Sequence, residues 1–186
     1  DADLERWVQD AVDERVTDGD RFMYYNLGYD VLGAVVAAVD GRSYTRYVAE
    51  EVLAPLGMER STFDAGALQR DDDAMTGYRP GEDGPEQAPF PLDELGAPAG
   101  GLVASPRELS RFLRAAMTDG SIDGARVCEP DTLERLQRPR AVRQTYLDGT
   151  EQSYGLGWMR QPLGEDAWVG HGGSILVSTA LAGFLA

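Results

Sequence analysis

The spacing of apolar residues changes once along this chain of 186 residues, and that change limits the folds available to it. Before about residue 138 the apolar positions recur every three or four residues, which is typical of amphipathic helices. After about residue 150 they alternate, or run together between turn residues, as in antiparallel strands. Helices first and strands afterwards predict an α+β protein rather than an alternating α/β one.

The first part of the chain predicts five helices, and each has a recognisable start or stop. Gly41 ends the second, and Ser105, Pro106 and Glu108 form a capping box at the start of the fourth. The second helix is apolar around much of its circumference, so we expect it to be deeply buried. The five predicted helices cover about 3–16, 27–39, 43–54, 105–119 and 130–137.

Residues 62–101 differ from the helical segments around them. They are rich in Asp, Gly and Pro and have no sustained apolar period, so we expect no regular structure there. A segment of this length is either disordered or a functional loop wrapped on a scaffold. The aromatic residues Tyr78 and Phe90 favour partial packing.

Three strand-like stretches close the chain. They are "YGLGWMRQ" at 154–161, "DAWVGHGG" at 166–173 and "VSTALAGFLA" at 177–186. Turn residues separate them, so we expect an antiparallel meander. The last stretch stops in mid-strand, with no turn or polar tail after it, which predicts an incomplete fold.

The charge of the chain is unusual. There are 32 acidic residues against 17 basic ones, all of the basic residues are arginine, and the net charge is −15. This balance argues against nucleic acid and anionic lipid as partners. Two explanations compete for the acidic, lysine-free pattern, a halophilic source and a codon bias towards arginine. We favour the halophile because codon bias does not explain the excess of acid.

A halophilic protein should depend on salt for its stability. Salt screens the mutual repulsion of dense carboxylates, so we expect the free energy of unfolding to rise between low and molar salt. Denaturant titrations at both salt concentrations measure this change. A fold indifferent to salt would contradict the halophilic interpretation.

Cysteine and histidine are too few for a metal centre or a disulfide framework. Cys128 and His171 are the single residues of their types, so a zinc site would have to rest on carboxylates and one imidazole. We therefore expect no metal and no cofactor.

No run approaches the roughly 18 apolar residues of a membrane span, and the acidic, amphipathic N-terminal stretch does not resemble a signal peptide.

Two short motifs carry residue types suited to chemistry. The first is "YYN", Tyr24 to Asn26, at the start of the second helix. From these residues alone, packing tyrosines with Asn26 as the N-cap are favoured over a reactive site. The second is "GHGGS" at 170–174. Glycines on both sides of His171 allow a ligand to approach the backbone closely, and a glycine-rich turn with a surface histidine explains them equally well.

Taken together and in order, these motifs and the segments between them resemble the serine β-lactamase and penicillin-binding-protein-like family. The segments are "YYN", "SYTRYVAEEVLAPLGMERSTF", "AGGLVASPRELSRFLRAAMTDG", "YGLGW" and "GHGGS". The branch is that of class C β-lactamases, D-Ala-D-Ala carboxypeptidases and esterases. The resemblance implies a β-lactamase/transpeptidase-like fold. Its helical subdomain, with the loop at 62–101, would cover 1–150, and antiparallel strands would cover 151–186.

The resemblance also implies a serine hydrolase that acts through an acyl-enzyme on an ester, a β-lactam or a D-amino-acid peptide. Tyr24 would shuttle a proton, and Asn26 would orient the substrate or a lysine. His171 would contact a substrate carboxylate or carbonyl. Gly172, Gly173 and Ser174 would line the substrate site, with the Ser174 backbone N–H in the oxyanion hole.

One family motif is missing, because a chain without lysine cannot contain Ser-x-x-Lys. We expect the chain to be part of a larger protein, with the nucleophile upstream of it and this part inactive alone. The alternative is a non-catalytic relative that binds a ligand or partner. An incomplete sheet also leaves an edge and a helix face exposed, so we expect the missing parts or self-association to cover them.

Overall fold

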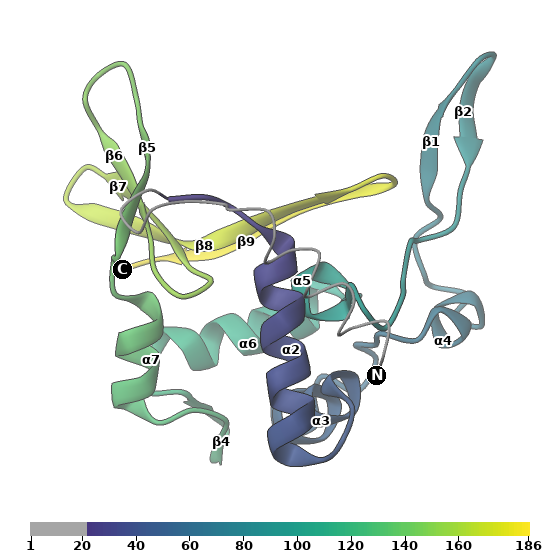
Figure 1. Ribbon diagram of the computed structural model, residues 1–186, viewed down its shortest axis with the longest axis horizontal. Helices are drawn as coiled ribbons and strands as arrows, with labels where there is room; N and C mark the ends of the chain where they lie inside the picture. Colours follow the sequence, from purple (N-terminus) through teal and green to yellow (C-terminus); the bar gives the residue numbers. More distant parts are fainter. Residues whose placement is uncertain (1–21) are drawn as a thin grey trace.

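The computed structural model describes residues 22–186 (Figure 1). The helix predicted at 3–16 lies outside these residues. The helices are α2 (Asn26–Asp40), α3 (Tyr44–Val48), η1 (Ala49–Leu53), α4 (Ala65–Gln69), α5 (Ala97–Gly100), α6 (Pro106–Met117) and α7 (Pro130–Gln137). The strands are β1 (Tyr78–Gly81), β2 (Gly84–Gln87), β3 (Ser121–Ile122), β4 (Ala125–Arg126), β5 (Ala141–Thr145), β6 (Glu151–Tyr154), β7 (Met159–Leu163), β8 (Asp166–Ile175) and β9 (Ser178–Leu185).

The C-terminal part forms the expected antiparallel meander, but with five strands in the order β5-β6-β7-β8-β9 rather than three. The strand predicted at 154–161 is interrupted, because residues 155–158 connect β6 to β7. Strands β8 and β9 make the longest pairing, from Trp168 opposite Leu185 to Ile175 opposite Ser178. The prediction of an α+β fold is confirmed. Strand β5 was not predicted because it is short and has a bulge in its pairing with β6, which interrupts the alternation of side chains.

Helix α2 forms where predicted and ends at Gly41, whose φ of 85° is the left-handed conformation that favours glycine. The expectation that this helix is deeply buried is wrong for residues 22–186. Its side chains Leu32, Val35 and Val39 are 55%, 52% and 84% exposed. The described part of the chain therefore leaves an apolar face of α2 uncovered.

The predicted role of Asn26 as the N-cap of α2 is also wrong. Tyr25 occupies the cap position in an extended conformation, with no side-chain hydrogen bond, and Asn26 is the first helical residue. The Asn26 side chain is exposed. Capping therefore does not explain why this position carries an amide.

Helix α5 packs closely on α2. A Cβ added to Gly33 would lie 2.1 Å from Pro98 Cγ, so only glycine allows this approach. The buried Asp30 carboxylate accepts a hydrogen bond from the Ala99 N–H at 3.1 Å. These contacts hold the face of α2 that carries Asp30 and Gly33 against α5, which precedes α6 in the chain.

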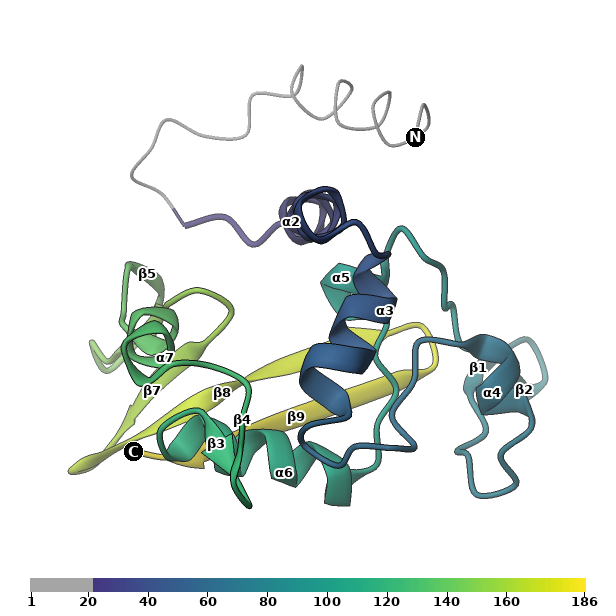
Figure 2. The same cartoon turned by 90° about the horizontal axis from the view of Figure 1, so that it is seen from below.

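The main core lies where η1 and the turn after it meet α6 and β3. Its buried side chains are Leu53, Leu56, Met58, Ala115 and Ile122. Trp158 joins this core to the sheet, because its ring lies 6.0 Å from the ring centroids of both Phe112 and Phe184. Helix α6 runs along β9 (Figure 2).

Helix α6 begins with half of the predicted capping box. Ser105 Oγ accepts a hydrogen bond from the Glu108 N–H at 3.2 Å. The Glu108 carboxylate does not return to Ser105. It accepts from the Arg60 N–H at 3.0 Å and the Ser61 hydroxyl at 2.7 Å. Glu108 thereby ties the 60–61 turn to α6.

The segment 62–101 contains more regular structure than its sequence predicted. It holds α4, the β1–β2 hairpin and α5, each only four or five residues long. Elements this short have no measurable apolar period. Thr62 and Val103 pair through two backbone hydrogen bonds of 2.9 Å, so the segment leaves the core and returns to one point. The hairpin projects away from the rest of the molecule (Figure 1).

None of the helices within residues 22–186 is long and apolar enough to cross a membrane.

Candidate functional site

The two motifs singled out from the sequence meet in space. Tyr24 lies just before α2 and His171 lies on β8, and their ring centroids are 5.8 Å apart with planes inclined at 37°. The Tyr24 side chain is 48% exposed, whereas His171 is half-buried. The fold therefore places a solvent-accessible phenol on a half-buried imidazole.

A third aromatic residue, Tyr154 at the end of β6, completes this cluster. Its hydroxyl lies 2.9 Å from His171 Nε2, and its side chain is buried. The Tyr24 ring meets the Tyr154 ring edge-on, with 6.4 Å between the ring centroids. The Phe22 ring also packs on Tyr154, with 5.0 Å between the centroids. Sequence reasoning gave Tyr154 no role, although it opens the "YGLGW" segment. Its partner is 17 residues away on another strand, and only the sheet brings the two together.

His171 uses both of its ring nitrogens. Nε2 meets the Tyr154 hydroxyl, and Nδ1 lies 2.5 Å from the Gly172 carbonyl oxygen. The imidazole is thus held from β6 on one side and by its own strand on the other. Its orientation is determined by these two contacts.

The strand that carries His171 is open along one edge beyond this point. Strand β7 pairs with β8 only as far as Met159 opposite Gly170. Within residues 22–186, positions 171–175 pair with β9 alone. Gly172 is half-buried in this stretch, and Gly173 and Ser174 are exposed. An open strand edge offers backbone N–H and C=O groups to an extended ligand.

Neither Asn26 nor Ser174 forms a hydrogen bond with Tyr24, Tyr154 or His171 among residues 22–186. No hydrogen bond of the Asn26 side chain is found in this described part of the chain. The Ser174 hydroxyl lies 3.4 Å from the Thr179 hydroxyl of β9, across the strand pair. The predicted roles of the Asn26 amide and the Ser174 backbone N–H stay predictions.

The glycines of "GHGGS" serve different purposes. Gly170 is buried, and a Cβ there would lie 2.2 Å from the Ala182 carbonyl oxygen and 2.6 Å from the Trp168 ring. At Gly173 a Cβ would meet nothing within 4 Å. The first glycine is therefore required by packing within the sheet, and the last one leaves open space beside the strand.

Burial determines the protonation of the cluster. It lowers the pKa of His171, and the positive charge of Arg143 lowers it further, against the opposing effect of the Gly172 carbonyl. Burial also raises the pKa of Tyr154, helped by the neighbouring phenols of Tyr29 and Tyr24. Near pH 7 the histidine is therefore a neutral imidazole, and Tyr154 is a neutral phenol.

The lowered pKa of His171 predicts a pH dependence of stability. Below the ordinary value of 6.5 the unfolded chain binds a proton that the folded chain still excludes. The contribution of the neutral imidazole is complete above pH 6.5 and is lost as the pH falls towards the lowered folded pKa. We expect His171→Gln to flatten the plot of unfolding free energy against pH in the range just below pH 6.5. Urea titrations of both proteins measure these slopes, and equal slopes would show that His171 is not perturbed.

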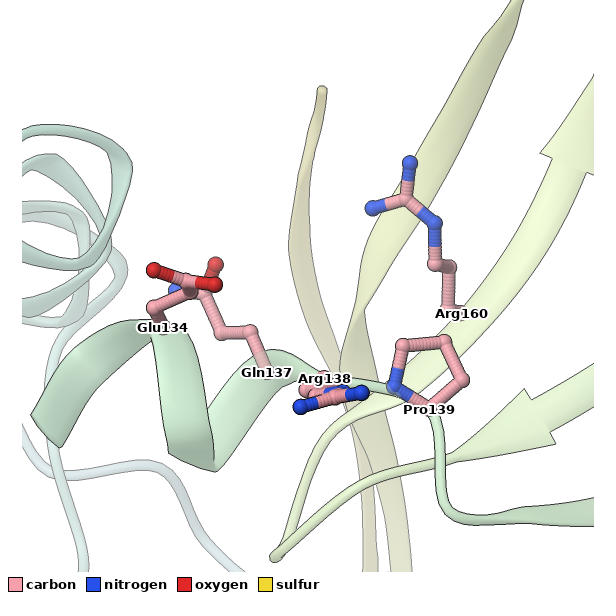
Figure 3. A pocket seen from close by; sticks show the side chains of 5 residues that line it. All are labelled: Glu134, Gln137, Arg138, Pro139 and Arg160. Atoms are coloured by element: carbon pink, nitrogen blue, oxygen red, sulfur yellow. The ribbon is translucent and has the colours of Figure 1, made fainter. Parts of the chain in front are cut away.

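Other features of the described chain lie away from this cluster. A pocket between α7 and β7 is lined by Glu134, Gln137, Arg138, Pro139 and Arg160 and contains none of the predicted site residues (Figure 3). Among residues 22–186 no group of three His, Cys, Asp or Glu side chains is placed to hold a metal ion. The candidate site is the open edge of β8 beside the aromatic cluster.

The chain matches one protein family over almost its whole length. The family model described as Beta-lactamase covers residues 2–185. Protein Rv1367c of Mycobacterium tuberculosis is 30% identical in an alignment of 166 residues, and the alignment covers 83% of this chain and 36% of that protein. The chain thus spans about a third of the length of this relative.

Solved structures share the fold. The octameric penicillin-binding protein homologue from Pyrococcus abyssi superposes with a TM-score of 0.83 at 28% identity, over 98% of this chain and 41% of that chain. The D-amino acid amidase from Ochrobactrum anthropi SV3 gives a TM-score of 0.67 at 24% identity, over 92% and 49% of the two chains. In both comparisons this chain corresponds to less than half of the solved one.

Proposed function

The chain belongs to the serine β-lactamase and penicillin-binding-protein-like family, and from this membership we propose that it supplies part of the active site of a serine hydrolase. The reaction would proceed through an acyl-enzyme. A serine oxygen attacks the carbonyl carbon, the leaving group departs with a proton, and water then cleaves the new ester. The substrate would be an ester, a β-lactam or a D-amino-acid peptide.

The observation that supports this proposal most is the approach of Tyr24 to His171. The two residues come from opposite ends of the described chain, and their rings lie 5.8 Å apart at the open edge of β8. A tyrosine that served only for packing would be expected to be buried, whereas Tyr24 is 48% exposed. An accessible phenol beside a free strand edge suits proton transfer to a substrate laid along that edge.

The remaining roles follow the family pattern. Tyr24 would relay the proton between the serine and the leaving group, and Asn26 would orient the substrate or a lysine. Gly172 and Gly173 would leave room for the substrate beside β8, and the Ser174 N–H would donate to the oxyanion. One such donor is typically worth a few kcal/mol of transition-state stabilisation.

The nucleophile would come from a part of the protein beyond these 186 residues. The sequence has no lysine and so no Ser-x-x-Lys pair. The chain covers 36% of its Mycobacterium tuberculosis relative, which leaves most of such a protein to supply that pair. We propose that the uncovered apolar face of α2 packs against this remainder or against another copy of the chain.

Acylation tests the proposed function directly. The longer protein that contains this chain should gain the mass of a β-lactam or activated-ester probe, with one adduct per molecule. The 186-residue chain alone should gain none. A stoichiometric adduct on a serine within the chain would overturn the proposed division of the site.

The second candidate is a non-catalytic relative that binds a ligand or partner on the same fold. The missing Ser-x-x-Lys pair favours it, because the described cluster holds no group activated for nucleophilic attack. The same experiment separates the two candidates. A longer protein with no upstream Ser-x-x-Lys and no adduct would leave the binding function.

A further inference from the structure

The contacts of His171 assign its proton. A backbone carbonyl oxygen can only accept a hydrogen bond, so the contact between Nδ1 and the Gly172 oxygen requires a proton on Nδ1. A neutral imidazole carries only one ring proton. Nε2 is then an acceptor, and the Tyr154 hydroxyl, 2.9 Å away, donates to it.

We infer that Tyr154 is a positioning residue that holds His171 as the neutral imidazole protonated on Nδ1, so that the histidine meets a substrate as an uncharged group. Tyr154 is suited to this task by its placement. It is 7% exposed and packs against the rings of Phe22 and Tyr24, which leaves its ring little freedom to turn away.

The groups around the imidazole favour the same state. Tyr24 faces it from the approach to α2, and Tyr154 faces it from β6, with Tyr29 of α2 beside that phenol. Arg143 of β5 places a positive charge nearby, which opposes a second proton on the ring. Among residues 22–186 no carboxylate contacts the ring to stabilise a cation. Burial acts in the same direction by lowering the pKa of His171.

The consequence for catalysis rests on the proposed function, whereas the proton on Nδ1 rests on the geometry. An uncharged imidazole with both nitrogens engaged does not attract a substrate carboxylate. The ring likewise has no free N–H to donate to a substrate carbonyl, because Nδ1 donates to Gly172 and Nε2 accepts from Tyr154. The ring would serve to hold Tyr24 and the strand edge in place, and neutral esters and amides would suit the site better than substrates with a carboxylate at this position.

The single histidine makes the inference testable without ambiguity. In the 15N-labelled 186-residue chain, a long-range 1H–15N correlation spectrum contains one imidazole. We expect the protonated shift on Nδ1 and the unprotonated shift on Nε2 at neutral pH. Tyr154→Phe keeps the ring shape and removes the donor. It should produce a mixture of tautomers and raise the pKa of His171 by about half to one unit.

Tyr25→Phe is the matched control, because it removes a phenol from the same approach to α2 outside the hydrogen-bonded cluster. It should leave the tautomer and the pKa unchanged. An Nε2-protonated ring in the unmodified chain would overturn the inference, whatever the variants do. A Tyr154→Phe spectrum identical to that of the unmodified chain would also overturn it. The spectrum is read without any substrate, so its failure is distinct from a failure of acylation.

Discussion

Replacing Tyr24 by Phe in the longer protein should lower its acylation rate by about two to four orders of magnitude, the usual contribution of a positioned acid–base group. The ring is retained, so its packing against His171 and Tyr154 should persist. The loss should appear in the rate of the chemical step rather than in substrate binding. Single-turnover acylation with an activated ester measures that step.

Tyr25→Phe is the control for this experiment as well. Tyr25 adjoins Tyr24 and is 38% exposed, but none of the described ring–ring contacts includes it. We expect its turnover to match that of the unmodified protein. An unchanged rate in Tyr24→Phe would remove Tyr24 from the chemistry and leave the cluster as packing.

Gly170→Ala should destabilise the fold by about 3 kcal/mol, because the new methyl group has no room. Its Cβ would lie 2.2 Å from the Ala182 carbonyl oxygen and 2.6 Å from Gly183 Cα, both in the backbone of β9. Backbone atoms cannot rotate away as a side chain can, so the two strands must separate locally. Urea-induced unfolding measures the loss, and the neighbouring His171 should lose its bond to Tyr154 as well.

Gly173→Ala is the same substitution three residues further along β8. Its Cβ would meet no atom within 4 Å, so we expect a change of less than about 0.5 kcal/mol. The comparison separates a steric effect from a general penalty on alanine in this strand. Equal destabilisation of the two variants would show that the close contacts at Gly170 are relieved at no cost.

The sequence predicted the long elements well. Helix α2 was predicted at 27–39 and lies at Asn26–Asp40, and α7 was predicted at 130–137 and lies there. Both have an apolar period over at least two turns and a clear start or stop signal. The elements within 62–101 were missed because four or five residues do not establish a period. Their positions depend on long-range contacts such as the pairing of Thr62 with Val103.

The candidate site was predicted in part. The order of the motifs indicated that Tyr24 and His171 belong to one site, and the fold brings their rings to 5.8 Å. The catalytic and binding roles of these residues stay predictions. Tyr154 was missed because a buried tyrosine in a strand is ordinarily core. Its hydroxyl gains a function only from the residue that lies opposite it.

The sequence by itself determined the family, the α+β order of helices before strands, and the absence of a Ser-x-x-Lys pair from this chain. Each of these is a property of residue type and spacing along the chain. The tertiary structure decided which glycine of "GHGGS" is required by packing, which face of α2 is uncovered, and which nitrogen of His171 carries the proton. These depend on atoms brought together from distant positions, and local spacing carries no information about such neighbours.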